Sequence, residues 1–204
     1  PLRFPLQDVY KFDARRILAG RITAGRLKVG DHLVFSPSNK TAIVQSIEGF
    51  NVDPPSSEAQ AGQSVGITLD EQIFVERGEI ASHRDSVPLV STVVRVNLFW
   101  MGRRPLEKGR KYTLRLATRE VACEVATIHR IIDTADLAQL QESQSVAKNQ
   151  VAEVTLRVKS PIAFDLSSSF ESTGRFVLVD EYDISGGGII TELVHDEQEG
   201  LREE

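Results

Sequence analysis

The stretch that decides the fold is RILAGRITAGRLKVGDHLVF, residues 16–35. It holds two runs rich in β-forming residues, 16–22 and 32–35, and turn formers lie between them. Gly25 suits a tight hairpin turn with a positive φ, and Gly30-Asp31 suits a turn into the next strand. The segment therefore predicts antiparallel strands joined by short turns.

Runs of the same kind recur along the rest of the chain, and turn formers such as Ser36-Pro37-Ser38-Asn39 separate them. Their lengths and spacing are typical of an all-β barrel or sandwich. The clearest are 42–47, 65–69, 91–99, 111–116, 121–128, 151–158 and 174–180. Only 134–146 has much helix-forming content, and it fits a turn or two of helix or an irregular loop equally well.

A domain boundary is predicted near residue 86. Residues 82–88 are mostly polar and end in Pro88, and a new strand run begins at Ser91. We therefore expect one β-barrel over residues 1–86, a second over 87–194, and an acidic tail or linker over 195–204. The tail has almost nothing to bury, so we expect it to be frayed or to act as a linker.

Composition narrows the function classes. The chain has 204 residues, 24 Lys and Arg against 29 Asp and Glu, and a net charge of −5, so nucleic-acid binding is not favoured. The single cysteine, Cys123, permits no internal disulfide, which suits the cytoplasm. No apolar run approaches the ~20 residues that span a bilayer, so no membrane partner is expected. Because the chain begins with Pro1, we expect a processed or excised part of a longer protein.

Several segments resemble the second domain of elongation factor Tu and its relatives, which is a β-barrel. The resemblance rests on Phe4 to Tyr10, Leu18 to Ile22, Gly25 to Asp31, Glu58 to Ile67 and Val75 to Ile80, which follow one another in the family's order. It implies a translation-factor domain-two barrel at the N-terminal side of the boundary.

Beyond the boundary the chain resembles the GTPase (large) subunits of bacterial sulfate adenylyltransferases. The segments that carry this resemblance are Leu98 to Met101, Pro105 to Tyr112, Val151 to Val154, Ser160 to Asp165 and Thr173 to Asp180. The implied fold class is all-β, with two consecutive antiparallel β-barrels, the second of the elongation factor Tu C-terminal type. One departure is Gly186-Gly187-Gly188, where a less glycine-rich ending is expected.

The resemblance also implies a function. The parent enzyme joins sulfate to ATP, giving adenosine 5′-phosphosulfate and pyrophosphate, and its GTPase subunit couples this reaction to GTP hydrolysis. The two barrels would be non-catalytic and would serve in interdomain coupling and subunit binding. The implied partners are the chain's own N-terminal GTPase domain, which would hold GTP and Mg²⁺, the small catalytic subunit, and a C-terminal adenosine 5′-phosphosulfate kinase domain, as in fused relatives. The alternatives are tRNA- or ribosome-binding barrels of an elongation factor, or a free-standing scaffold.

No residue of this chain is expected to be catalytic, cofactor-binding or metal-binding. Residues 20–27 are the nearest approach to a phosphate-binding loop, but they lack its Lys and hydroxyl and favour a hairpin. Gly186-Gly187-Gly188 favours a flexible turn or bulge before a closing strand over an anion nest. Cys123 fits a buried inert thiol. Four histidines, His32, His83, His129 and His195, are scattered without metal-ligand spacing.

The densest basic cluster follows the strand that ends near Phe99. If the cluster has no binding role, it is a solvated loop between two strands. If it has one, it contacts a partner subunit or an acidic surface. The candidate contact residues are Trp100, Arg103, Arg104, Lys108 and Arg110, with Lys111 beside them.

Overall fold

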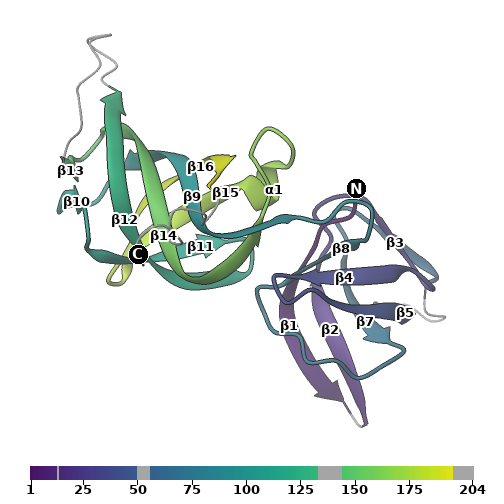
Figure 1. Cartoon of the computed structure of the whole chain (residues 1–204). Helices are drawn as coiled ribbons and strands as arrows, with labels where there is room; N and C mark the ends of the chain where they lie inside the picture. The colour runs from purple at the N-terminus through teal and green to yellow at the C-terminus, as the bar shows by residue number, and fades with distance from the viewer. Residues whose placement is uncertain (13, 50–55, 133–143, 195–204) are drawn as a thin grey trace, which may run out of the picture. The chain divides into compact units, whose positions relative to one another are not determined.

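The protein is described by a computed structural model that covers residues 1–204 except 13, 50–55, 133–143 and 195–204 (Figure 1). It divides into two units, Pro1–Pro88 and Leu89–Glu204. Each unit contains a closed six-stranded antiparallel barrel, so the predicted all-β fold with two consecutive barrels is confirmed. The expected boundary after residue 86 and the observed division after Pro88 differ by two residues.

Two parts of the chain on which predictions were made lie outside the described residues. They are the tail, 195–204, and most of the helix-favouring stretch, of which 134–143 are not described. The end of that stretch, Ser145–Val146, is the short strand β13, so a helix does not continue to its end.

The first barrel has the strand order β1-β2-β7-β5-β4-β8, and β3 and β6 pair beside it as a small sheet. The strands are β1 (Phe4–Phe12), β2 (Arg15–Arg21), β3 (Arg26–Lys28), β4 (His32–Ser36), β5 (Lys40–Glu48), β6 (Glu58–Gln60), β7 (Ser64–Leu69) and β8 (Ile80–His83). Apolar residues that alternate along these strands fill the interior, including Phe4, Leu18, Phe35 and Ile67. Burying each such side chain contributes about 1.5–3 kcal/mol.

Gly25 has the positive φ that the sequence predicts, 75°. A Cβ at this position would lie 2.7 Å from the carbonyl oxygen of Pro1, so the turn also needs glycine for space. The predicted hairpin is wrong, however. β2 pairs with β1 and β7, and β3 pairs with β6, because the chain after Gly25 leaves the barrel to build the side sheet.

The second barrel has the strand order β11-β12-β14-β9-β16-β15, and β10 and β13 form its side sheet. The elements are β9 (Leu89–Trp100), β10 (Leu106–Glu107), β11 (Lys111–Leu116), β12 (Arg119–Ile132), β13, β14 (Val151–Phe164), α1 (Glu171–Gly174), β15 (Arg175–Asp180) and β16 (Asp183–Leu193). Its interior includes Val96, Leu98, Leu114, Leu156 and Leu178.

The three consecutive glycines lie inside β16, which corrects the prediction of a turn before the closing strand. The register shifts immediately before them, where Leu178 faces Gly186 and Val179 faces Ile184, so a bulge is present next to the glycines. At Gly188 a Cβ would lie 1.9 Å from the backbone oxygen of Asn97 on β9. The glycines therefore allow β16 to approach β9 closely.

Two of the segments that carry the family resemblance meet through a buried polar pair. The Thr173 hydroxyl donates to the Asp165 carboxylate at 2.6 Å, and the Asp165 N–H donates to the Thr173 carbonyl at 3.0 Å. Both residues are buried. This pair fixes the connection from β14 through α1 into β15.

Candidate partner-contact surface of the second barrel

The basic cluster predicted from the sequence lies between β9 and β11, beside the turn that joins β15 to β16. The N–H of Met101 donates to the carbonyl of Ser185 at 2.7 Å, so the loop after β9 is attached to the start of β16. The turn itself passes through Glu181, which has a φ of 57°. Residues distant in sequence thus form one end of the barrel.

Trp100 is part of the core and does not form a contact surface. Its side chain is 0% exposed, its indole N–H donates to the Arg104 carbonyl at 2.8 Å, and its ring meets Tyr112 edge-on with centroids 5.6 Å apart. A Cβ at Gly102 would lie 2.6 Å from the indole ring. The expected partner contact through Trp100 is therefore wrong, and its role is to fix the path of the loop.

Arg104 and Arg110 are held by carboxylates of this chain. Both guanidinium groups donate to the same oxygen of Asp180, at 3.1 and 3.0 Å, and Arg104 also reaches Glu181 at 3.0 Å. The side chain of Asp180 is only 9% exposed, so its charge needs these donors. The two arginines order the loop against the turn.

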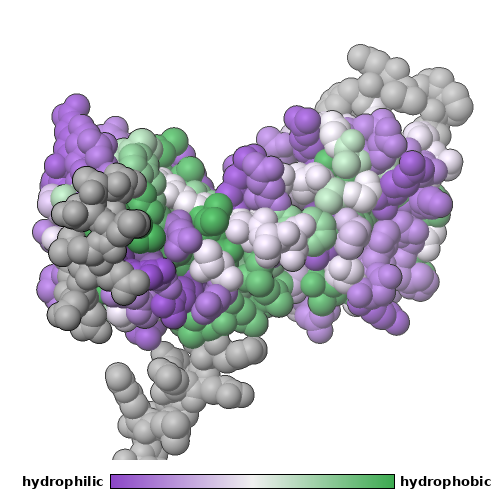
Figure 2. All heavy atoms as spheres, turned by 90° about the horizontal axis from the view of Figure 1, so that it is seen from above, coloured by the Kyte–Doolittle hydropathy of each residue, from purple (hydrophilic) through white to green (hydrophobic). Residues whose placement is uncertain are grey.

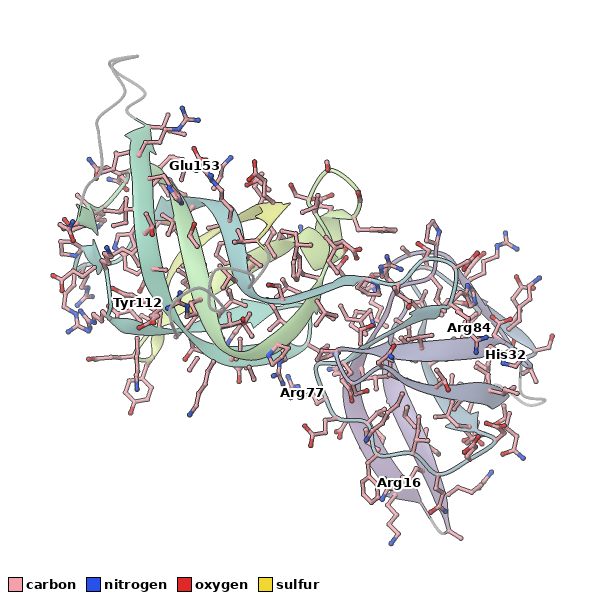
Figure 3. The ribbon with its side chains drawn as sticks, in the orientation of Figure 1. Arg16, His32, Arg77, Arg84, Tyr112 and Glu153 are labelled. Carbon is pink, nitrogen blue, oxygen red and sulfur yellow. The ribbon has the colours of Figure 1, made fainter. Side chains whose placement is uncertain are left out.

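Tyr112, labelled in Figure 3, supports the same loop from β11. Its hydroxyl accepts the N–H of Glu107 at 3.0 Å, and the guanidinium of Arg110 lies 5.8 Å from its ring centroid. Burial raises the pKa of Tyr112, against the opposing effect of the Glu107 hydrogen bond. The phenol is therefore a neutral structural group at ordinary pH.

What remains exposed here is a mixture of apolar and basic side chains, which we name the loop–turn surface. Its members are Met101, Arg103, Lys108, Tyr182 and Ile184. Tyr182 is 96% exposed, and neither Arg103 nor Lys108 makes an ion pair with any described residue. Figure 2 shows that hydrophobic areas interrupt a largely hydrophilic surface. Exposed aromatic and Met side chains beside Arg are typical of protein interfaces.

The other candidate side chains have structural surroundings. Cys123 is buried, as predicted, and burial raises the pKa of its thiol to about 12. His83 contacts Asp31 at 2.8 Å, and His129 contacts the Thr155 hydroxyl at 2.6 Å. Among the described residues no group of three or more His, Cys, Asp or Glu could hold a metal ion.

Two closed antiparallel barrels in succession also occur in known proteins. Residues 93–191 match the family model described as GTP-eEF1A C-terminal domain-like. Solved structures of Sup35, complexed with GDP or with GMPPNP, align with a TM-score of 0.87 over 96% of this chain and 48% of theirs. At 19% identity this likeness shows the fold alone.

In sequence the chain is homologous to proteins named sulfate adenylyltransferase subunit 1. It is 35% identical over 88% of its length to the protein of that name from Shewanella oneidensis, and 32% identical over 94% to the one from Aeromonas salmonicida. The resemblance seen in the sequence is thus confirmed. The chain spans 38% and 41% of the length of these relatives. They are named as a subunit of an enzyme, so a partner subunit is implied for them.

Sequence reasoning missed the apolar members of the loop–turn surface. Tyr182 lies in the turn before β16, between Glu181 and Asp183, and Ile184 follows in the strand; an aromatic between two acidic residues is a signal of exposure that was available. No described helix is long and apolar enough to cross a membrane.

Proposed function

We propose that this chain is the non-catalytic barrel pair of a sulfate adenylyltransferase GTPase subunit, and that the loop–turn surface binds the small catalytic subunit. The observation that carries the proposal is the 35% identity to subunit 1 over 88% of the chain. GTP and Mg²⁺ would be bound by a GTPase domain outside these 204 residues, since residues 20–27 form strand, turn and strand here.

The structure supports such a role because the exposed side chains are held by an ordered base. Arg104 and Arg110 converge on Asp180, and Trp100 fills the space below the loop. A surface that is ordered before binding loses less conformational entropy on association. Closed barrels also move as rigid bodies, which suits the transmission of a nucleotide state between domains and subunits.

The test is binding of the chain to the small catalytic subunit from the same genome, measured by calorimetry at moderate salt. Tyr182→Ala and Ile184→Ala together should weaken binding by tenfold or more, about 1.4 kcal/mol or more, as expected for central interface residues. Phe74→Ala is the matched control, because Phe74 is 72% exposed on the first barrel. Binding that the double variant leaves unchanged would move the contact to another surface. A folded chain that does not bind would remove subunit binding from these barrels.

A second candidate function is binding of tRNA or the ribosome, to which the resemblance of the first barrel to the second domain of elongation factor Tu points. The net charge of −5 opposes it. RNA binding that weakens steeply with rising salt would support this candidate, and binding to the catalytic subunit without such RNA binding would support the first.

A further inference from the structure

The outer face of the second barrel carries a basic hollow that begins beside the basic cluster described above, since Lys111 directly follows Arg110. It is a depression of about 490 Å³ over β9, β14, β12 and β11, four strands that are neighbours in the barrel. Its lining includes Lys111, Arg157 and Lys159 around Ala122, with Glu124 as its one carboxylate. The floor is small and apolar, and the rim is mainly cationic.

The three cations of this basic hollow are unusual in an acidic chain. Lys111 and Arg157 are the strand partners on either side of Glu124, so one carboxylate faces two cations across the ladder. Lys111, Arg157 and Lys159 are exposed, and none makes an ion pair with a described residue. The hollow therefore has an excess positive charge that attracts an anionic group.

The strongest anionic segment of the chain starts beside this hollow. The hydroxyl of Ser91 donates to the carbonyl of Val194 at 3.0 Å, and the next residue of β9, Thr92, lines the hollow. The ten residues that follow Val194 include five carboxylates and one guanidinium, namely Asp196, Glu197, Glu199, Glu203 and Glu204 against Arg202. Ten residues can span roughly 33–36 Å, which is ample for this reach.

We propose that the acidic segment 195–204 binds the basic hollow of its own barrel. The carboxylates pair with Lys111, Arg157 and Lys159, and the short tether supplies an effective concentration in the mM range, so weak ion pairs suffice to populate the contact. A binding partner with an acidic surface would have to displace the segment first. The hollow is thus a site whose occupancy is set by competition between anionic groups.

The experiment uses the full 204-residue chain with a nitroxide attached at Gln198→Cys, and measures broadening of backbone amide NMR signals. Cys123 is buried, so the thiol reagent reaches the new cysteine. The link of four residues to Val194 by itself keeps the label within about 14 Å of Val194, so the readout is the loss of intensity of the Ala122, Glu124, Arg157 and Lys159 amides beyond the loss in high salt. In about 1 M NaCl, where the screening length falls to about 3 Å, this excess loss should disappear.

The decisive variant is Arg157→Glu with Lys159→Glu, which should remove the excess loss of intensity in low salt. Its matched control is Lys11→Glu with Lys28→Glu, two exposed lysines of the first barrel with the same change of charge, which should leave the excess loss unchanged. An excess loss that survives the first pair of changes would overturn the proposal, as would one that arises only between labelled and unlabelled copies. The same broadening in low and high salt would also overturn it, and shifts of these amides on addition of inorganic sulfate or an acidic peptide would then assign the hollow to a separate anion.

Discussion

The two barrels are both closed and six-stranded, but they differ in strand order and in how their ends are stabilised. In the first, the buried carboxylate of Glu79 accepts backbone N–H groups, from Glu76 at 2.7 Å and Ser38 at 3.2 Å. In the second, carboxylates are paired with arginines, as at Asp180 and at Glu153, which accepts from Arg130 at 2.7 Å and also from Arg95. Glu79 thus relies on main-chain donors, whereas Asp180 and Glu153 rely on side-chain cations.

The strands differ as well. β12 and β14 each have 14 residues, whereas the longest strands of the first barrel have nine. Longer strands place more residues on the outer face of the second barrel, where Ala122, Glu124, Arg157 and Lys159 of β12 and β14 line the basic hollow. The difference teaches that a barrel gains room for binding surfaces by lengthening strands, while its interior keeps the same closed arrangement.

The comparison of the two barrels predicts the largest loss of stability for a substitution of Trp100. Trp100→Ala should destabilise the second barrel by about 3–5 kcal/mol, because it empties a fully buried site and leaves the Arg104 carbonyl without its donor. Barrel-resolved hydrogen exchange by NMR measures the loss, and the first barrel should keep its protection. The exposed Phe74→Ala serves as the control, and because it removes only the contact of its ring with Arg16 we expect a change of at most about 1 kcal/mol, confined to the first barrel. Equal loss of protection in both barrels would show that they unfold as one unit.

A smaller effect is expected for Gly188→Ala. The new Cβ would start 1.9 Å from the Asn97 oxygen, so β16 must move away from β9 at a cost of about 1–3 kcal/mol. The neighbouring Gly187→Ala is the matched control, since its nearest atom is at 3.2 Å, and it should cost less. Thermal unfolding of both variants measures the difference. If the two variants were equally stable, close approach of β16 to β9 would not explain the glycines.

In the first barrel, Glu79→Gln tests the main-chain clamp. The substitution keeps the shape but turns an amide NH₂ toward one of the two backbone N–H donors, so we expect a loss of about 1–3 kcal/mol. Denaturant unfolding followed by first-barrel NMR signals measures it. Exposed Glu71→Gln provides the control. A neutral Glu79→Gln would mean that the carboxylate charge contributes nothing to closing this barrel.

The smallest effect concerns pH and Glu153, which is labelled in Figure 3. Partial burial alone would raise its pKa, but the hydrogen bonds and charges of Arg95 and Arg130 outweigh burial and lower it. Because the pKa of Glu153 is lower in the folded protein than in the unfolded chain, where it is about 4.3, ionised Glu153 stabilises the fold at any pH above that value. This contribution is lost as the pH falls through the folded pKa. Glu153→Gln should reduce the fall in unfolding free energy of the second barrel below about pH 5. The reduction should be under about 1 kcal/mol, because Arg95 and Arg130, which pair with Glu153, are partly exposed. An unchanged slope in urea titrations would contradict this.

Local sequence patterns predicted the strands and the two barrels because alternation and turn residues are short-range properties. The positive φ of Gly25 was predictable for the same reason. The pairing of β3 with β6 was not, because it joins residues about thirty positions apart, and no local rule specifies which edge a strand finds. The glycines of β16 were misassigned on the same ground, since their cause is the backbone of β9.

Trp100 shows a signal that was present but not used. Val96, Leu98 and Trp100 alternate with Asn97 and Phe99, so the period of two that places Val96 and Leu98 inside also places the indole inside. Its basic neighbours in the sequence favoured a surface position instead. The pairing of Arg104 and Arg110 with Asp180 spans about seventy residues and could not be found from the cluster itself.

The first and last residues of the first unit are held together by hydrogen bonds of one residue, Arg3. Arg3 is buried, and its guanidinium donates to the carbonyl of Ser86 at 2.6 Å, while its backbone bridges to Ala24. A pulling force applied to the two ends of this unit would act first on that fastening, and the strands behind it would be shielded until it opened. The barrel is therefore built as a mechanical module that a longer chain can load without unzipping it from either end.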